Sequence, residues 1–275
     1  MVSAQADLEV RVGCEFAYEA DDAPTPAIVI VRPDEASRVL AEAWATDPRL
    51  AVHDYVDVYG NRCRRLTIPP GTTTLRYDAR VTIPSEPDAA DPSAPVLLVE
   101  DLPDETLLYT LPSRFCLSDE LSDRAWELFG ATPPTWERVR AICDWVHGRL
   151  AFAYGSSRPV TTARDALEAG TGVCRDFAHL AVTFCRAMSI PARYVFGYLP
   201  DIGVPPPGLP MDFCAWFEAY LGDRWWTFDP RNNERRIGHI VIARGRDALD
   251  VAMITTYGGA RLKRMTVWAD HLDNG

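Results

Sequence analysis

Hydrophobic and polar residues alternate along much of the first hundred residues, in short runs separated by turn-forming residues. An alternation with a period of two is typical of strands that bury one face. We predict strands at 8–18, 27–32, 51–59, 64–68 and 73–83. Several short strands in succession favour a small all-β unit, either a sandwich or a barrel.

The stretch 84–95 breaks this pattern, because it is rich in proline, aspartate, serine and alanine. Such a composition is typical of a linker. We therefore predict two domains, an all-β N-terminal domain at residues 1–97 and a second domain at residues 98–275.

After residue 100 the period of the hydrophobic pattern changes to about 3.6. It predicts helices at 118–130, from 135 onward, at 162–169 and at 174–188. Strand-like runs then return at 192–199, 213–221, 224–229, 239–243 and 261–268. Helices followed by an antiparallel sheet indicate an α+β fold for the second domain.

Cys174 opens the last of these helices, directly after Gly172 and Val173. Free N–H groups and the positive end of the helix dipole favour a thiolate at this position, and the same N–H groups can bind an oxyanion. A buried core cysteine, as we expect for Cys185, explains the residue equally well. The local sequence leaves both interpretations open.

A predicted hairpin brings two further residues together. If Gly222 and Asp223 form a two-residue turn, Trp216 lies opposite Asp229. Cys214 shares a face with Trp216, so it lies diagonal to Asp229, about 7–8 Å away between Cα atoms. Asp229 is then either the carboxylate that orients a group at position 214 or a strand-end residue in a turn with the following proline.

Four blocks of sequence resemble the bacterial transglutaminase-like family, and the resemblance extends over roughly residues 100–268. The blocks are Thr171-Gly172-Val173-Cys174-Arg175-Asp176, Ile190-Pro191-Ala192-Arg193, Asp212-Phe213-Cys214-Ala215-Trp216-Phe217 and Trp226-Thr227-Phe228-Asp229-Pro230-Arg231. The resemblance implies a papain-like cysteine proteinase fold, with an N-terminal β domain of the kind that often accompanies this family.

In that family the blocks supply a cysteine, a histidine and an aspartate. Carried over to this sequence, Cys174 is the nucleophile and Asp229 the acid, but Cys214 stands where the family has histidine. A thiol cannot accept a proton near neutral pH and return it to a leaving amine, as imidazole does.

The other histidines do not obviously replace the missing one. His179 is about 140° around the helix from Cys174 and faces away. His147 falls within the family resemblance but not at the histidine position of the triad. For His239, on a C-terminal strand, an exposed or packing role is favoured over catalysis.

Two more residues are candidates for substrate binding. Trp216 could line the cleft or contribute to an oxyanion site, but Trp225 and Trp226 nearby favour a core role. Arg175, beside the nucleophile, could orient substrate, although a structural role is favoured for it as well.

The sequence thus predicts a cysteine hydrolase or acyltransferase that acts on peptide or isopeptide amides through a thioester at Cys174, with hydrolysis favoured over crosslinking. One alternative is a protein that has lost its base and keeps the cleft for binding peptides or as a scaffold. The other is a metal site, because Cys174, Cys214 and Asp229 are ligand types that hold Zn²⁺; we rank it last and expect no metal or cofactor.

The charge balance limits the classes of molecule that the protein is expected to bind. With 28 basic and 39 acidic residues, the net charge is −11, which argues against nucleic acid or an anionic membrane. A peptide or protein substrate is the expected partner.

Seven scattered cysteines without a CxxC pair fit reduced thiols, and we find no secretion signal or spanning segment, so we predict a cytoplasmic protein.

Overall fold

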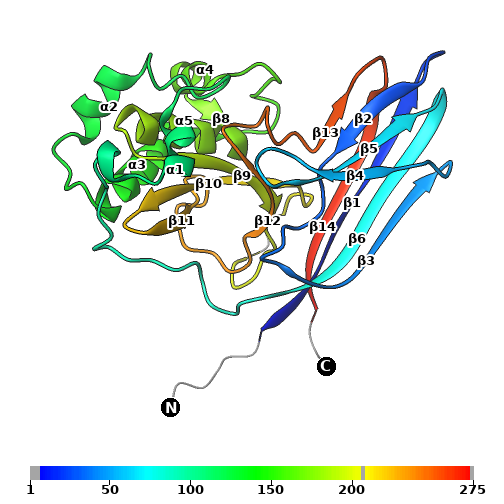
Figure 1. Ribbon diagram of the computed structural model, residues 1–275, viewed down its shortest axis with the longest axis horizontal. Helices are drawn as coiled ribbons and strands as arrows, with labels where there is room; N and C mark the ends of the chain where they lie inside the picture. The colour runs from blue at the N-terminus through cyan, green and yellow to red at the C-terminus, as the bar shows by residue number, and fades with distance from the viewer. Residues whose placement is uncertain (1–6, 206–207, 273–275) are drawn as a thin grey trace.

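The computed structural model describes residues 7–205 and 208–272. Figure 1 shows a β sandwich next to a second part, in which helices cover one face of a four-stranded sheet. This arrangement confirms the α+β fold with an all-β region at its N-terminal side.

The β sandwich consists of two four-stranded antiparallel sheets. One has the order β14 (Arg261–Leu272), β1 (Leu8–Ala20), β6 (Gly71–Ile83) and β3 (Arg38–Asp47). The other has the order β13 (Ile254–Thr256), β2 (Thr25–Val29), β5 (Arg62–Ile68) and β4 (His53–Val56). The five strands predicted in this region all form, within a few residues of the expected bounds.

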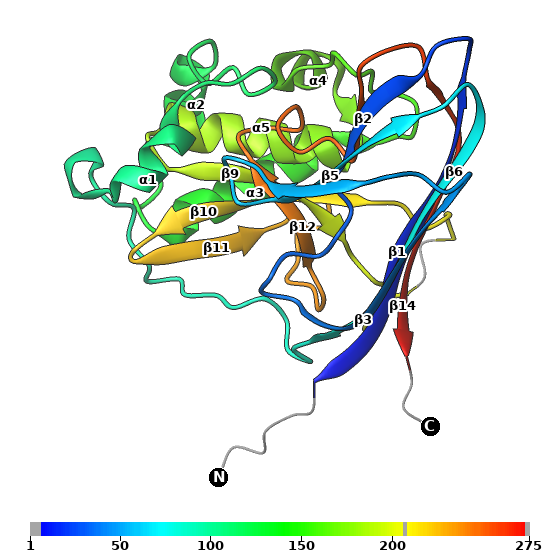
Figure 2. The same ribbon diagram turned by 45° about the vertical axis from the view of Figure 1, so that its right-hand side comes forward.

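Three strands of the sandwich differ from the sequence-based expectation. Strand β3 was not predicted, because its alanines and glutamate are weak strand formers and most of its residues are exposed. Strands β13 and β14 lie beyond residue 98, yet they pair with β2 and β1. Figure 2 shows β14 beside β1 along its length. Residues 254–256 and 261–272 therefore complete the sandwich, although the division at residue 98 placed them in the second domain.

The segment between the two parts packs against the second part. The Gly222 N–H donates to the Pro95 carbonyl, and the Asp88 N–H donates to the Arg236 carbonyl. Three short helical turns follow: η1 (Val99–Asp101), α1 (Asp104–Leu107) and η2 (Leu108–Thr110).

The second part holds four longer helices and the site-bearing sheet. The helices are α2 (Ser122–Phe129), α3 (Trp136–Arg149), α4 (Ala163–Ala169) and α5 (Cys174–Ala187). The sheet has the order β11 (Arg224–Phe228), β10 (Cys214–Leu221), β9 (Ala192–Tyr198) and β12 (Ile240–Gly245). A short parallel pair, β7 (Ala151–Phe152) and β8 (Thr171–Gly172), precedes α5.

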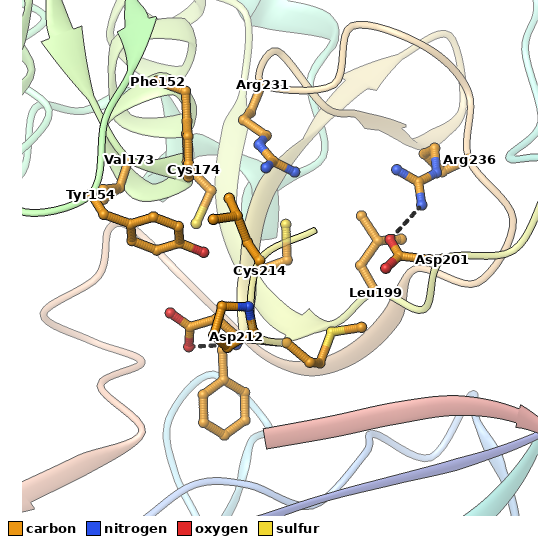
Figure 3. Close-up of a pocket in the computed structure, with 14 residues that line it drawn as sticks. Phe152, Tyr154, Val173, Cys174, Leu199, Asp201, Asp212, Cys214, Arg231 and Arg236 are labelled. Atoms are coloured by element: carbon orange, nitrogen blue, oxygen red, sulfur yellow. Dashed lines mark hydrogen bonds and ion pairs between the residues drawn. The ribbon is translucent and has the colours of Figure 1, made fainter. Parts of the chain in front are cut away.

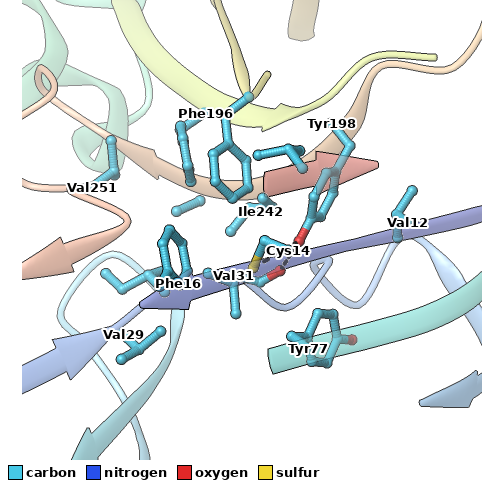
Figure 4. Packing of buried hydrophobic residues seen from close by; sticks show 14 of the residues in the cluster. Val12, Cys14, Phe16, Val29, Val31, Tyr77, Phe196, Tyr198, Ile242 and Val251 are labelled. Carbon is cyan, nitrogen blue, oxygen red and sulfur yellow. Dashed lines mark hydrogen bonds between the residues drawn. The ribbon is translucent and has the colours of Figure 1, made fainter. Parts of the chain in front are cut away.

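A continuous hydrophobic core joins the two parts. Phe196 and Tyr198 of β9 pack in one cluster with Phe16 of β1 and Val31, as Figure 4 shows. The Tyr198 hydroxyl donates to the Val31 carbonyl over 2.9 Å. The β sandwich therefore supports the back of the sheet that carries the site.

No helix in the described ranges is long and apolar enough to cross a lipid bilayer.

Candidate active site

Helix α5 places Cys174 at a defined point against the sheet. The helix is buried along nearly all of its length between the other helices and strands β9 and β10. The Val173 N–H donates to the Asp176 carboxylate over 2.9 Å and so caps the first turn. Residue 172 must be glycine here, because a Cβ atom would lie 2.7 Å from Cβ of Asp176. The sulfur of Cys174 thus sits at the N-terminal end of a rigid helix.

The hairpin of β10 and β11 has the predicted register. Leu221 pairs with Arg224 and Phe217 pairs with Phe228 across the turn, so the pairing ends one residue before Asp229. Cys214 is the first residue of β10 and pairs with Gly197 of β9. The local sequence therefore determined this part of the site.

Cys174 and Cys214 line one pocket, with a volume of about 170 Å³, and Figure 3 shows both sulfur atoms directed into it. Cys174 also packs directly against the small buried cluster that contains Cys214. The walls are mostly apolar, with four charged side chains among them. The lining residues are Phe152, Tyr154, Val173, Cys174, Leu199, Asp201, Leu209, Pro210, Met211, Asp212, Phe213, Cys214, Arg231 and Arg236.

The pKa values of the two thiols are shifted in opposite directions. A hydrogen bond from the Cys214 thiol lowers the pKa of Cys174; burial opposes this effect, and the charge of Arg231 adds to it. The same hydrogen bond, together with burial, raises the pKa of Cys214 well above its ordinary value. Ionisation therefore places the negative charge on Cys174, while Cys214 keeps its proton.

Asp229 is buried, but its carboxylate is bound to other groups than the thiols. It accepts hydrogen bonds from the N–H of Arg231 and from the N–H and side-chain amide of Asn232. Its Oδ2 atom also lies 3.3 Å from Nε2 of His239. Burial opposes ionisation of Asp229, yet these hydrogen bonds outweigh it and lower the pKa. Asp229 does not line the pocket of the two cysteines.

His239 is the partner of Asp229 that the sequence did not reveal. Its Nδ1 lies 2.6 Å from Asp88, its ring lies 4.5 Å from the Trp216 ring, and its side chain is only 3% exposed. Burial disfavours the charged imidazolium, but the two carboxylates outweigh it and raise the pKa of His239 to about 9. The expected packing role is therefore accompanied by an ionic one. No signal in the local sequence marks this ionic role, because Asp88 lies in the segment that was predicted to be a linker.

The residues predicted to bind substrate lie elsewhere. Trp216 is fully buried behind Cys214, and its Nε1 has no hydrogen-bond partner among the described residues. Arg175 donates to Ser157 and to the Arg158 carbonyl and lines a separate shallow depression. The structure does not bring either side chain into the pocket of Cys174.

His179 and His147 have structural roles outside the pocket. His179 is fully buried; it accepts a hydrogen bond from the Ala248 N–H, and burial lowers its pKa well below the ordinary value. His147 bonds through Nδ1 to the carbonyls of Pro230 and Arg231 and so holds the loop after Asp229. Neither side chain lines the pocket.

None of the four charged residues of the pocket, Asp201 among them, was recognised from the sequence. Asp212 and Arg231 belong to the blocks that resemble the family, but nothing in their spacing showed that they would face Cys174. Arg236 lies five residues after Arg231, in a loop without regular structure. Burial is the main cause that raises the pKa of Asp212.

A zinc site finds no support in the side-chain geometry. In residues 7–205 and 208–272 no three histidine, cysteine or acidic side chains are grouped so that they could hold a metal ion. The carboxylate of Asp229 is bound to Asn232 and His239, so it does not complete a ligand set with the two cysteines.

A cysteine at the start of a helix that packs on an antiparallel sheet is the arrangement of a papain-like thiol domain. Comparison with known proteins agrees with this. A model of the transglutaminase-like superfamily matches residues 124–230. A solved structure described as a "Putative Cysteine Protease from Cytophaga hutchinsonii" superimposes with a TM-score of 0.88 and 32% identity, covering 98% of this chain and 93% of that one.

Two mycobacterial relatives are described as uncharacterized. The Mycobacterium leprae protein is 38% identical over 117 residues, which span 42% of each chain. The Mycobacterium tuberculosis protein is 30% identical over 220 residues, covering 71% of this chain and 68% of that one. The chain belongs to the transglutaminase-like superfamily.

Proposed function

We propose that the protein is a cysteine hydrolase that cleaves peptide or isopeptide amide bonds through a thioester at Cys174. The observation that supports this most directly is a half-buried thiol with a lowered pKa, in a pocket at the N-terminus of a helix. The other six cysteines are buried, and burial raises the pKa of Cys63 to about 11 and that of Cys14 to about 12.

The reaction needs a group that donates a proton to the leaving amine. The Cys214 thiol cannot serve as this group. In the proposed mechanism the Cys174 sulfur forms a bond to the acyl carbon, the C–N bond breaks, and the amine leaves with a proton. Asp212 lines the same pocket, and burial raises its pKa and so favours its protonated form. We therefore propose Asp212 as the proton donor. Water then hydrolyses the thioester: its oxygen forms a bond to the acyl carbon, the C–S bond breaks, one water proton returns to Asp212, and the Cys174 thiolate is restored.

A second candidate function is a binding or scaffold protein that uses the same cleft for peptides. Two observations favour it: Cys214 replaces the catalytic histidine, and Asp229, which would orient that histidine, is bound by His239 instead. Both candidates take a peptide or protein as partner and need no cofactor. All seven cysteines are unpaired, which fits the reducing cytoplasm that we propose as the location.

We expect Cys174 to be the most reactive thiol of the folded protein near neutral pH, because it alone combines a lowered pKa with a pocket. Intact-mass measurement after treatment with iodoacetamide should show one label, which peptide mapping places on Cys174 and which the Cys174→Ala variant lacks. Cys185 is the internal control, since it is fully buried. Equal labelling of both thiols would remove the basis for a catalytic role.

A separate prediction concerns Asp212. We expect Asp212→Asn to slow cleavage of an acyl p-nitroanilide by about 10²-fold, since loss of a proton donor typically costs 10²–10⁴-fold. The p-nitrophenyl ester of the same acyl group should change little, because p-nitrophenolate leaves without a proton. If both substrates slow down equally, Asp212 shapes the pocket and does not donate a proton.

A further inference from the structure

The pocket next to Cys174 contains an arginine whose charge has no acidic partner in residues 7–205 and 208–272. The Arg231 guanidinium donates to the side-chain carbonyl of Asn232 over 3.0 Å and lies over the Phe152 ring, 4.5 Å from its centroid. Among the described residues no carboxylate lies within ion-pair distance of it, whereas other arginines near the sheet, such as Arg244 and Arg193, bind acidic groups.

A second arginine of the same pocket also has unused hydrogen-bonding capacity. The side chain of Arg236 is only 6% exposed, and it binds the Pro200 carbonyl at 3.1 Å and Asp201 at 3.6 Å. Its Nε atom is buried without a partner in the described part of the chain. A buried donor without a partner is costly, which makes such a group a candidate for ligand binding.

Of the two acidic residues of the pocket, one pairs with Arg236 and neither lies within ion-pair distance of Arg231. Asp201 is paired with Arg236. Asp212 hydrogen-bonds to its neighbour, the Phe213 N–H, and burial raises its pKa. Arg231 is therefore the positive charge of this pocket that has no ion-pair partner among the described residues.

Size and wall chemistry limit what this charge can bind. A volume of about 170 Å³ is close to that of an engineered cavity of about 150 Å³ that holds one benzene ring, so there is room for about one side chain. Most of the walls are apolar, and a guanidinium binds a carboxylate through two parallel hydrogen bonds. The complementary group is a short alkyl chain that ends in a carboxylate.

We propose that Arg231, assisted by Arg236, binds a carboxylate on the acyl part of the substrate, so that the protein acts on acyl groups with a free carboxylate a few bonds from the scissile carbonyl. The proposal rests on Cys174 as the nucleophile. The carboxylate can be the side chain of an acidic residue or, in an isopeptide bond, its α-carboxylate.

The first experiment tests recognition without turnover. Iodoacetate and iodoacetamide both alkylate a thiolate: the S–C bond forms and iodide leaves. We expect the iodoacetate-to-iodoacetamide rate ratio at Cys174 to exceed that of glutathione at least about tenfold, the typical effect of a hydrogen bond to a charged group. Arg231→Gln should bring the ratio down to that of glutathione. The matched control is Arg235→Gln, an exposed arginine on the same loop, which should leave the ratio unchanged.

The outcomes separate the possible roles of Arg231. If Arg231→Gln slows both reagents equally, the arginine only stabilises the thiolate, and the proposal is wrong. A wild-type ratio equal to that of glutathione would also overturn it. If Arg231→Gln does not fold, Arg231→Lys serves instead, because it keeps the charge but not the two parallel donors, and it should lower the ratio without abolishing the preference.

The second experiment uses turnover. Mono-p-nitrophenyl succinate should be hydrolysed with a higher kcat/KM than p-nitrophenyl butyrate, and Arg231→Gln should remove most of that difference. N-acetyl-α-glutamyl and N-acetyl-γ-glutamyl p-nitroanilides then distinguish the side-chain carboxylate from the α-carboxylate. Equal rates for the two esters would contradict the proposal. If no substrate turns over while Cys174 still prefers iodoacetate, the pocket binds carboxylates and the hydrolase function fails.

Discussion

Replacement of Cys214 by histidine is expected to raise the hydrolysis rate of an acyl p-nitroanilide, because it restores an imidazole next to Cys174. General acid–base help is typically worth about 10²–10⁴-fold. We expect a gain near the lower limit, since the carboxylate of Asp229 is already bound by Asn232 and His239. The buried, closely packed surroundings of Cys214 also leave limited room for the larger ring.

Two controls test whether the gain depends on Cys174 and whether the variant is folded. The gain should vanish in the Cys174→Ala background, and circular dichroism should show that the Cys214→His variant is folded. If a folded Cys214→His variant neither turns over faster nor labels faster at Cys174 near neutral pH, the cleft lacks more than a base. The binding or scaffold function would then be the better description.

The second large effect is expected at His239. This imidazolium lies between the carboxylates of Asp88 and Asp229, so His239→Gln leaves two acidic groups in contact with a neutral amide. Removal of one partner from a buried ionic cluster typically costs about 3–5 kcal/mol. Urea unfolding should show a loss of this order near pH 6, whereas His53→Gln, on the exposed strand β4, should change the free energy of unfolding little. A loss below about 1 kcal/mol would indicate that the cluster is not ionic.

The same residue predicts a pH dependence of stability. The pKa of His239 is about 9 in the folded protein and about 6.5 in an unfolded chain. The folded state therefore binds the proton more tightly. The stabilisation is fully present below about pH 6.5 and is lost as the pH rises towards 9. Comparison of wild type with His239→Gln across this range should show the difference in unfolding free energy shrinking with pH. A constant difference would contradict the raised pKa.

The local sequence determined the elements and the register of the hairpin. Helix α5 begins at Cys174 because Gly172 and Asp176 shape its first turn, and the turn at Gly222 and Asp223 specifies which residues of β10 and β11 pair. These features depend on residues a few positions apart, so hydrophobic period, capping and turn chemistry suffice to predict them. The blocks that resemble the family identified its fold, and the comparisons confirm the family.

The tertiary structure decided which distant groups meet. His239 binds Asp229 because Asp88, from a segment with the composition of a linker, lies on the other side of the ring. Arg231 and Asp212 line the pocket of Cys174 because the loops after β11 and before β10 converge there. Likewise, β14 completes the sandwich by pairing with β1, more than 200 positions earlier in the chain. Such contacts are determined by the packing of whole elements, for which residue spacing carries no signal. The sequence alone therefore specified the helix, the hairpin and the nucleophile candidate, and the fold specified their charged surroundings.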